Sequence, residues 1–566
     1  MQSVCRSSIP KPPVPAAMAS VLRQFLCCSW GGPAILAVVA WCWTVAAIDP
    51  AGDYPSASQG PGLTVDEVFN VQQGVLLANS LLDGDLPAYR RACDLLPDHP
   101  PLGRLCLGLA HEFWWIVHPP VPSDVPYSIT CARVGSATAF ALTILLIGTF
   151  AGRWYGPLGG LAAAVAVLLQ PRVFGHAHLA SLESGMNLAY CAAVLAVARW
   201  SEASTPPKWR AAAGAGGLLG LAALTKVQAI LLPLPVILWA VIVWRRRAAV
   251  PLLVWGLTGL LVFYAGWPWL WEHPWTHLQQ YLGRTTDRAS VYVWYFGKSL
   301  ADRDVPWHYP WVLFATTVPL GLHLLACGGL VVKATEPQTP GNPPSTRPWL
   351  TAAEMLVLVC LVFPLVVFSI PGVAVYDGAR LFLMVFPLWA IFVGRGAVVL
   401  LDRLSCRWNL RLAGVVVGGV LAGQCVGNLL LAPCYLSYYN ALTGGLWGAD
   451  RLGLQPTYWG DSITRELLGK VAEHVPAGAN VQVAPTLHQF QWPELQQQSP
   501  ILRRRRIRLV SFDSRYSKPG KYLLLFMRWE YLSPEIRQIV ARQPPVAAVR
   551  RQGVLLAALY DLEGLP

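Results

Sequence analysis

The chain has 566 residues, of which 54% are hydrophobic and only 13% are charged, and its mean hydropathy is +0.44. A soluble protein of this length carries roughly a quarter of charged residues and divides into several domains. The composition therefore excludes a purely soluble chain. The formal net charge of +13 does not indicate nucleic-acid binding, because the basic residues stand in short clusters between apolar runs, as in the cytoplasmic loops of membrane proteins.

Apolar runs predict a polytopic α-helical membrane protein with about eleven transmembrane helices, since a span needs roughly 17–25 mainly apolar residues. The runs lie at about 31–49, 132–150, 157–171, 186–200, 211–225, 228–244, 249–266, 310–332, 351–370, 380–398 and 411–431. The transmembrane module is therefore expected over 31–431.

Basic residues set the expected orientation, because Lys and Arg gather in cytoplasmic loops. The N-terminal segment 1–30 carries Arg6, Lys11 and Arg23, and the run at 228–244 ends in three arginines, Arg245 to Arg247. With the N-terminus in the cytoplasm, alternation leaves the following segments outside: 50–131, 172–185, 267–309, 371–379 and everything after 432. We expect a multi-pass protein of the plasma (inner) membrane.

Two outside segments are too long to be simple connectors. Segment 50–131 contains helical patterns at about 65–82 and 102–117, which we expect to lie at the membrane interface. The tail, 432–566, regains charged residues and alternates strand-like patches at 481–483 and 523–526 with helical patterns near 463–474 and 533–542. This alternation predicts a small extracytoplasmic α/β domain.

Two adjacent carboxylates, Asp66 and Glu67, follow the first apolar run in the outer segment. Thr64 with Glu67 three residues later also matches a capping box at the start of a helix. Capping and catalysis are compatible, because a carboxylate at a helix N-terminus is held in place by that same geometry. Both interpretations stay open on the residues alone.

Further charged residues are expected at the same face of the membrane. Glu183 stands at an apolar helix end, where a carboxylate is costly unless it has a partner or lines a watery cavity. Lys226 lies at the turn between two apolar runs, and Arg380 follows the Tyr376-Asp377-Gly378 loop. Each basic residue alone is typical of a snorkelling side chain, but together they indicate an anionic ligand such as a lipid phosphate.

The outer segment contains the string His99-Pro100-Pro101-Leu102-Gly103 after the acidic pair and before an amphipathic helix. These features, and above all the string, resemble the outer segment of the GT-C glycosyltransferases related to protein O-mannosyltransferases and aminoarabinose transferases (glycosyltransferase family 39 type). The resemblance continues over about 30–400, and two further segments are similar to bacterial family 39-type relatives. The first runs from Tyr376 to Phe382, and the second runs from Tyr438 to Gly445 and is accompanied by Tyr458 to Asp461.

This resemblance implies transfer of one sugar, with inversion, from a polyprenyl-phosphate carrier to a protein, lipid or glycan acceptor at the outer membrane face. The acceptor hydroxyl needs a base, the oxocarbenium-like centre needs a carboxylate, and the leaving phosphate needs cations. By position Asp66 is the expected base or the carboxylate that positions the acceptor, with Glu67 beside it. Glu183 occupies a second acidic site where relatives usually have Asp. His99, Lys226 and Arg380 are the expected contacts of the donor phosphate.

The same residues would also suit a lipid-linked sugar transporter or a non-catalytic binding protein of this fold, because a fold hosts many functions. A transporter usually shows repeat symmetry and broken helices in mid-membrane, which the sequence does not indicate. Membrane lipids and the lipid-linked sugar are the expected partners, and the acceptor is left open. The cofactor is also left open, with a divalent metal as one alternative.

Overall fold

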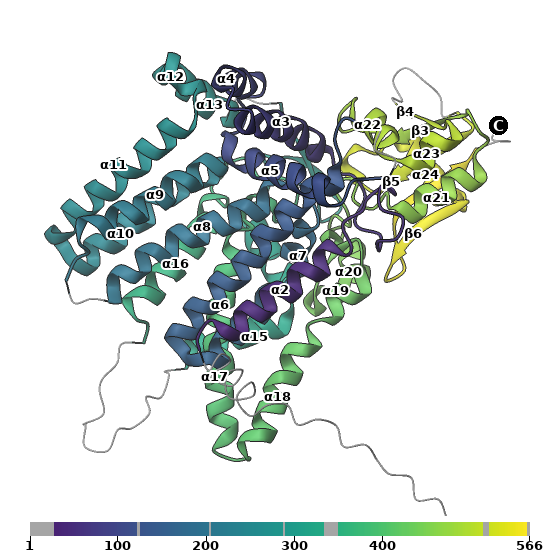
Figure 1. The fold of residues 1–566 in the computed structure, drawn as a ribbon. Coiled ribbons are helices and arrows are strands. Elements are labelled where there is room, and N and C mark those ends of the chain that lie inside the picture. Colours follow the sequence, from purple (N-terminus) through teal and green to yellow (C-terminus); the bar gives the residue numbers. More distant parts are fainter. Residues whose placement is uncertain are drawn as a thin grey trace, which may run out of the picture.

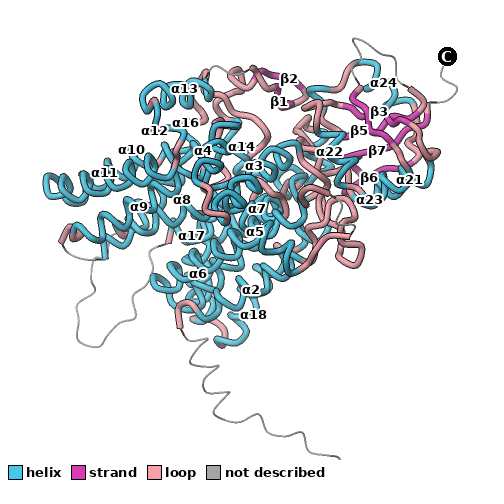
Figure 2. Tube along the Cα trace, turned by 45° about the horizontal axis from the view of Figure 1, so that its top comes forward, coloured by secondary structure: helices cyan, strands magenta, loops and turns pink. Residues whose placement is uncertain are grey.

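The computed structural model describes residues 28–121, 125–202, 205–286, 289–332, 349–512 and 520–562. Most of them are helical, and a small sheet lies beside one end of the helical body (Figure 1). In Figure 2 the strands gather at that end, apart from the short pair β1 (Tyr292–Tyr295) and β2 (Lys298–Ala301). The expected class is thus confirmed: an α-helical membrane protein with a small C-terminal α/β domain. Residues 1–27 of the predicted cytoplasmic segment lie outside the described residues.

Several helices are long and apolar enough to cross a membrane. Four pass this test, over Ile129–Leu168, Val227–Gly266, Val385–Ser405 and Leu410–Leu431, and two sharply bent helix pairs raise the number to six. Two shorter apolar helices, Gly31–Val45 and Ala352–Val367, add to these in the described part of the chain. The number eleven is not confirmed by this count and stays a prediction, as does the orientation of the termini.

Some predicted spans merge in the structure. The runs at 132–150 and 157–171 form one element, α6 (Ile129–Leu168), which changes direction at Gly156, where φ is 82°. A positive φ costs glycine little, and the following Pro157 supplies no amide donor to the turn before it. The two predicted helices are therefore continuous around a kink. The helical body comprises α2 (Gly31–Val45), α6, α7 (Pro171–Ala177), α8 (Leu182–Ala198), α9 (Trp209–Thr225), α10 (Pro233–Trp244), α11 (Ala249–Gly266), α14 (Tyr309–Thr317), α15 (Leu320–Val331), α16 (Ala352–Val367), α17 (Val385–Ser405), α18 (Leu410–Gly423) and α19 (Val426–Leu431).

The two helices expected in the outer segment are present as α3 (Val65–Leu82) and α5 (Pro101–Val117). They pack closely because glycines face each other: a Cβ on Gly108 would meet the Gly74 carbonyl oxygen at 1.9 Å. Their position at a membrane interface stays a prediction. The helices that pack near α3 and α5 are completed by α4 (Leu86–Leu95), α12 (Trp269–Glu272) and α13 (Pro274–Thr286).

The C-terminal domain contains a five-stranded mixed sheet in the order β4-β3-β5-β7-β6. Both predicted strands are confirmed, as β3 (Asn480–Ala484) and the wholly buried β5 (Tyr522–Phe526). The predicted helices are α21 (Arg465–His474) and α24 (Pro534–Arg542). The other elements are α20 (Gly445–Arg451), α22 (Gln491–Gln498), α23 (Pro500–Arg505), β4 (Arg508–Ser511), β6 (Ala547–Arg551) and β7 (Val554–Asp561).

This domain is joined to the outer helices by polar contacts. Glu494 of α22 accepts hydrogen bonds from the Tyr127 hydroxyl at 2.5 Å and from Gln72 of α3 at 3.1 Å. On the other flank, Arg465 of α21 pairs with the buried Asp49 at 2.8 Å. The C-terminal domain is therefore held against α3, the helix that begins with the acidic pair.

Candidate active site

A cavity of about 360 Å³ opens between the start of α3, the loop before α5, the loop after α16 and the C-terminal domain. Its walls carry both charged and aromatic side chains. They are Val65, Asp66, Phe69, Asn70, Asp98, His99, Arg104, Val291, Tyr376, Asp377, Arg380, Trp459, Thr486, Leu487, His488, Arg528 and Tyr531. Three of the residues predicted from sequence, Asp66, His99 and Arg380, thus line one cavity although they are far apart in the chain.

Arg380 lies at the centre of the charged cluster. Its Nε donates to Glu183 at 2.8 Å, one Nη donates to Asp377 at 3.0 Å, and the other donates to Asp66. The guanidinium also stacks over Trp459, with its Cζ 4.1 Å from the ring centroid. These bonds use three of the five N–H donors of the guanidinium. Arg380 therefore orders three carboxylates around the cavity and keeps capacity for a further acceptor.

Glu183 connects Arg380 to Lys226. The carboxylate stands in the first turn of α8, directly after a bend of 115° between α7 and α8. A carboxylate is favoured there by the N-terminal end of the helix dipole. Lys226, the residue at which α9 ends, donates to the same Oε1 at 2.5 Å, and both side chains are buried. The three predicted residues Glu183, Lys226 and Arg380 are thus connected by consecutive ion pairs. Arg380 lines the cavity, whereas Glu183 and Lys226 are buried next to it and do not line it.

Of the three carboxylates bonded to Arg380, Asp66 is the one whose side chain reaches solvent. Its side chain is 29% exposed, against 2% for Glu183 and 7% for Asp377. Burial raises the pKa of Asp66 above that of a free carboxyl, while the positive charge of Arg380 opposes this rise. A raised pKa brings a carboxylate closer to the range suited to a general base.

Glu67 has a different environment from its neighbour. It is fully buried and pairs with Arg133 through two bonds of 2.7 Å, and it also accepts the backbone amides of Thr64 at 2.8 Å and Ala180 at 2.7 Å. It does not line the cavity. The capping box considered from the sequence is present. The structure therefore places Glu67 outside the cavity in which a catalytic role was expected for it. Its bonds instead fix the start of α3.

His99 faces the cavity beside two charged residues, Asp98 and Arg104. Its Nε2 lies 4.0 Å from Asp98, and its buried Nδ1 has no hydrogen-bond partner among the described residues. Arg104 pairs with Asp98 at 2.8 Å and so fixes the loop that carries the histidine. Burial lowers the pKa of His99 to about 3, so the imidazole is neutral and offers one N–H donor.

The C-terminal domain supplies site residues that the sequence reasoning missed. Arg528 donates to Asp377 at 2.9 Å from the far side of the cavity, and Trp459 supports Arg380. Asp377 lies within a segment that resembles family relatives, but nothing near Arg528 pointed to this cavity. Its one local signal is position, since a lone arginine follows the apolar strand β5 directly after Met527.

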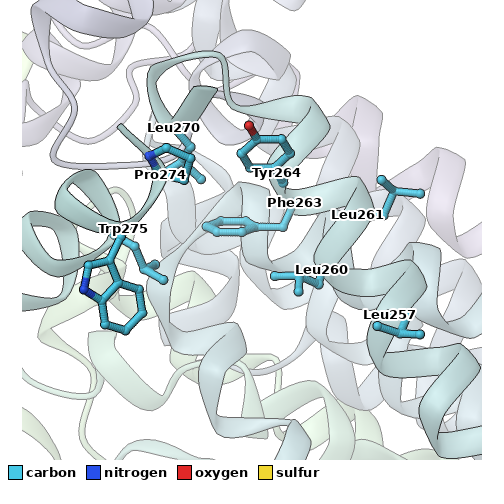
Figure 3. Close-up of a pocket in the computed structure, with 9 residues that line it drawn as sticks. Leu257, Leu260, Leu261, Phe263, Tyr264, Leu270, Pro274 and Trp275 are labelled. Carbon is cyan, nitrogen blue, oxygen red and sulfur yellow. The ribbon is translucent and has the colours of Figure 1, made fainter. Parts of the chain in front are cut away.

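Two apolar pockets lie near Lys226, apart from the charged cavity that Arg380 lines. The nearer one, of about 420 Å³, is bounded by α9, α10, α11 and α13 and includes the side chain of Lys226 in its wall. The outer one, of about 510 Å³, continues along α11 towards α13 (Figure 3). Leu260, Phe263 and Leu278 line both pockets, so we call the two together the apolar groove. Lys226 thus stands where an apolar groove meets a charged cluster.

The described residues contain no group of three or more His, Cys, Asp or Glu side chains arranged to hold a metal ion. His176 lies 4.0 Å from Glu183, while the Nδ1 of His178 is bonded to the Phe174 carbonyl at 2.7 Å. The two histidines therefore do not converge on one point.

One family model matches the chain. Residues 126–271 match the model described as dolichyl-phosphate-mannose-protein mannosyltransferase. The resemblance seen in the sequence is confirmed over this segment. The segment includes Glu183 and Lys226 and ends before Arg380.

Two solved structures are similar in outline. One is the crystal structure of ArnT from Cupriavidus metallidurans bound to undecaprenyl phosphate, at 13% identity and a TM-score of 0.46, covering 97% of this chain and 99% of that one. The other is the same protein in the apo state, at 14% identity and a TM-score of 0.45, covering 96% and 98% of the two chains. No curated protein sequence matches the chain.

Proposed function

We propose that the protein is an inverting glycosyltransferase that moves a sugar from a polyprenyl-phosphate carrier to an acceptor hydroxyl at the outer membrane face. The observation that carries this proposal is the position of Lys226. Its ammonium belongs to the charged cluster, and its side chain lines the apolar groove. A polyprenyl-phosphate donor needs this junction, because an apolar tail and an anionic head must be bound at adjacent places.

The charged cluster supports a direct displacement. Asp66 accepts the proton of the acceptor hydroxyl, while the hydroxyl oxygen of the acceptor forms a bond to the anomeric carbon. The bond from that carbon to the phosphate oxygen breaks, and the lipid phosphate leaves with the electron pair. Arg380 and Lys226 stabilise the developing negative charge. His99, held neutral, is suited to donate one further hydrogen bond to a phosphate oxygen.

The carboxylates of Glu183 and Asp377 have supporting tasks in this proposal. Glu183 accepts from both Lys226 and Arg380 and so holds the two cations close to each other. Such charges in a buried site remain ordered only where each has an opposite partner. Because these side chains are arranged before a donor binds, little reorganisation is needed during the reaction.

The decisive experiment incubates the purified full chain with a panel of polyprenyl-phosphate sugars and measures the released lipid phosphate. Release that depends on Asp66 supports the transferase. Binding of donors without release from any of them would favour a transporter or a binding protein. A reporter fused after residue 450 tests the proposed face, and a reporter active only in the cytoplasm would overturn it.

A further inference from the structure

Arg528 belongs to the C-terminal domain but reaches the charged cluster of the helical body. It follows β5, separated from Phe526 by Met527, and it is only 4% exposed. Its Nε donates to Glu530 at 2.7 Å, one Nη donates to Asp377 at 2.9 Å, and the other donates to the Tyr458 carbonyl. The guanidinium is thus fixed from three directions, two of them within the C-terminal part of the chain.

Asp377 is held between two arginines. One oxygen accepts from Arg528 at 2.9 Å, and the other accepts from Arg380 at 3.0 Å. Its backbone has a φ of +55°, a left-handed conformation that aspartate visits more readily than most residues. The two ion pairs therefore fix both the side chain and the loop that leads into Arg380.

We propose that Arg528 is a positioning residue for the transfer reaction, acting through Asp377 to orient Arg380 and to balance the charge that surrounds Asp66. This inference rests on the function proposed above. It makes the C-terminal domain a working part of the site, because Arg528 holds one oxygen of Asp377 while Arg380 holds the other.

The charges around Asp66 come from every element packed against it. Arg380 and Asp377 lie on the loop before α17, Glu183 and Lys226 at helix ends, and Arg528 and Glu530 on the C-terminal domain. The neighbouring charged or titratable groups also include Asp98, His99, Arg104, His176, Tyr376, His488 and Tyr531.

Within this set the sign of the effect is defined. Burial raises the pKa of Asp66, and the negative charges of Glu183 and Asp377 raise it further. The positive charge of Arg528 offsets that of Asp377. Without Arg528 the pKa of Asp66 rises, so the base becomes protonated, and activity is lost, at a higher pH than in the wild type.

The test measures release of lipid phosphate against pH for the full chain and three variants. Arg528→Gln removes the charge, Arg528→Lys keeps it, and Arg537→Gln is the matched control. Arg537 is an arginine of the same domain whose side chain donates to the carbonyls of Leu532 and Trp529 and lies over the Trp294 ring, with no carboxylate partner among the described residues. We expect the acid limb of Arg528→Gln to move up by about one pH unit, the scale of one partly screened charge. The limbs of Arg528→Lys and Arg537→Gln should match that of the wild type.

A purely structural role predicts another result. If Arg528→Gln lowers the rate by the same factor at every pH, the inference is overturned. Should this variant fail to fold, Glu530→Gln tests the same inference, with an expected shift in the opposite direction. It leaves more of the Arg528 charge facing Asp377, so the acid limb should move down, and an unchanged limb contradicts the inference. A wild type that releases no lipid phosphate removes the proposed function itself, whereas an active wild type with unmoved limbs in the variants removes only this inference.

Discussion

Asp66 and Glu67 are neighbours in the first turn of α3, and each pairs with an arginine from a distant part of the chain. Arg133, the partner of Glu67, uses all five donors: two bonds to the carboxylate and three to the carbonyls of Ile48, Pro61 and Gly62. Arg380, the partner of Asp66, uses three donors on three different carboxylates. The first cluster is closed and fully buried, and the second lines a cavity.

The difference shows how two chemically similar ion pairs acquire different roles. A buried charge pair with every donor and acceptor satisfied has no capacity for a ligand, and breaking it leaves an uncompensated charge. A pair that shares one arginine among several carboxylates beside a cavity can change partners when an anion arrives. The closed cluster therefore stabilises α3, and the open cluster is suited to chemistry.

The largest effect is expected from Asp66→Asn. The amide matches the carboxylate in shape but cannot accept a proton, so transfer should fall by about 10²–10⁴-fold, the usual contribution of a general base. Release of lipid phosphate measures the loss, and the melting temperature should stay close to that of the wild type. Folded Asp66→Asn protein with wild-type turnover would remove this residue from the catalytic role.

Glu67→Gln should have the opposite profile. It leaves Arg133 buried with an incomplete partner, which typically costs about 3–5 kcal/mol of stability. We expect a clearly lowered melting temperature in detergent, with turnover per folded molecule largely kept. A variant as stable as the wild type but inactive would show that Glu67 acts in the chemistry after all.

Arg380→Lys tests the open cluster. An ammonium cannot bond three carboxylates and still bind two phosphate oxygens as a guanidinium does. The loss of one charged hydrogen bond, about 1–3 kcal/mol, should lower kcat/KM for the donor by roughly 5–150-fold.

The alternative is that Arg380 has only a structural role, in which its bridge to Asp377 at 3.0 Å is the pair that matters for activity. A charge swap, Arg380→Asp with Asp377→Arg, should then restore activity. We expect no rescue, because the new arginine would face Arg528 and the new carboxylate would face Asp66 and Glu183. Recovery of donor use in the double swap would end the phosphate assignment.

The smallest effect concerns the apolar groove. Leu260 lines both of its pockets, so Leu260→Ala should weaken use of a long-chain donor by about fivefold, near 1 kcal/mol for the lost contact. A donor with a short tail should be affected less. Leu253→Ala is the matched control, because Leu253 is similarly exposed on α11 but lines neither pocket. Equal losses in both variants would argue against a tail in the groove.

Much of this protein could be predicted from residue patterns. Apolar runs and their lengths identified most helices of the body, and the capping box located the start of α3. Alternating patches identified β3, β5, α21 and α24. These features depend on neighbours within a few residues, where backbone periodicity and side-chain burial are expressed directly.

The site was only partly predictable. The chemistry of Asp66, Glu183, Lys226 and Arg380 was indicated by charges at the ends of apolar segments, where they are costly without partners. Which charge meets which could not be predicted, because Arg380 lies 314 positions from Asp66 in the chain. The residue pattern also gave no reason to assign different roles to Asp66 and Glu67, because they are adjacent carboxylates in the same helical turn.

The amino-acid sequence by itself determined the membrane class, most of the helices and the presence of costly charges at the ends of apolar segments. Only the tertiary structure decided that Glu67 turns inward to Arg133 while Asp66 faces the cavity. It also decided that Arg528, from a separate domain, completes the cluster. The physical reason is that an α-helix sends consecutive side chains about 100° apart, and a buried charge takes its role from whichever distant groups the fold brings to it.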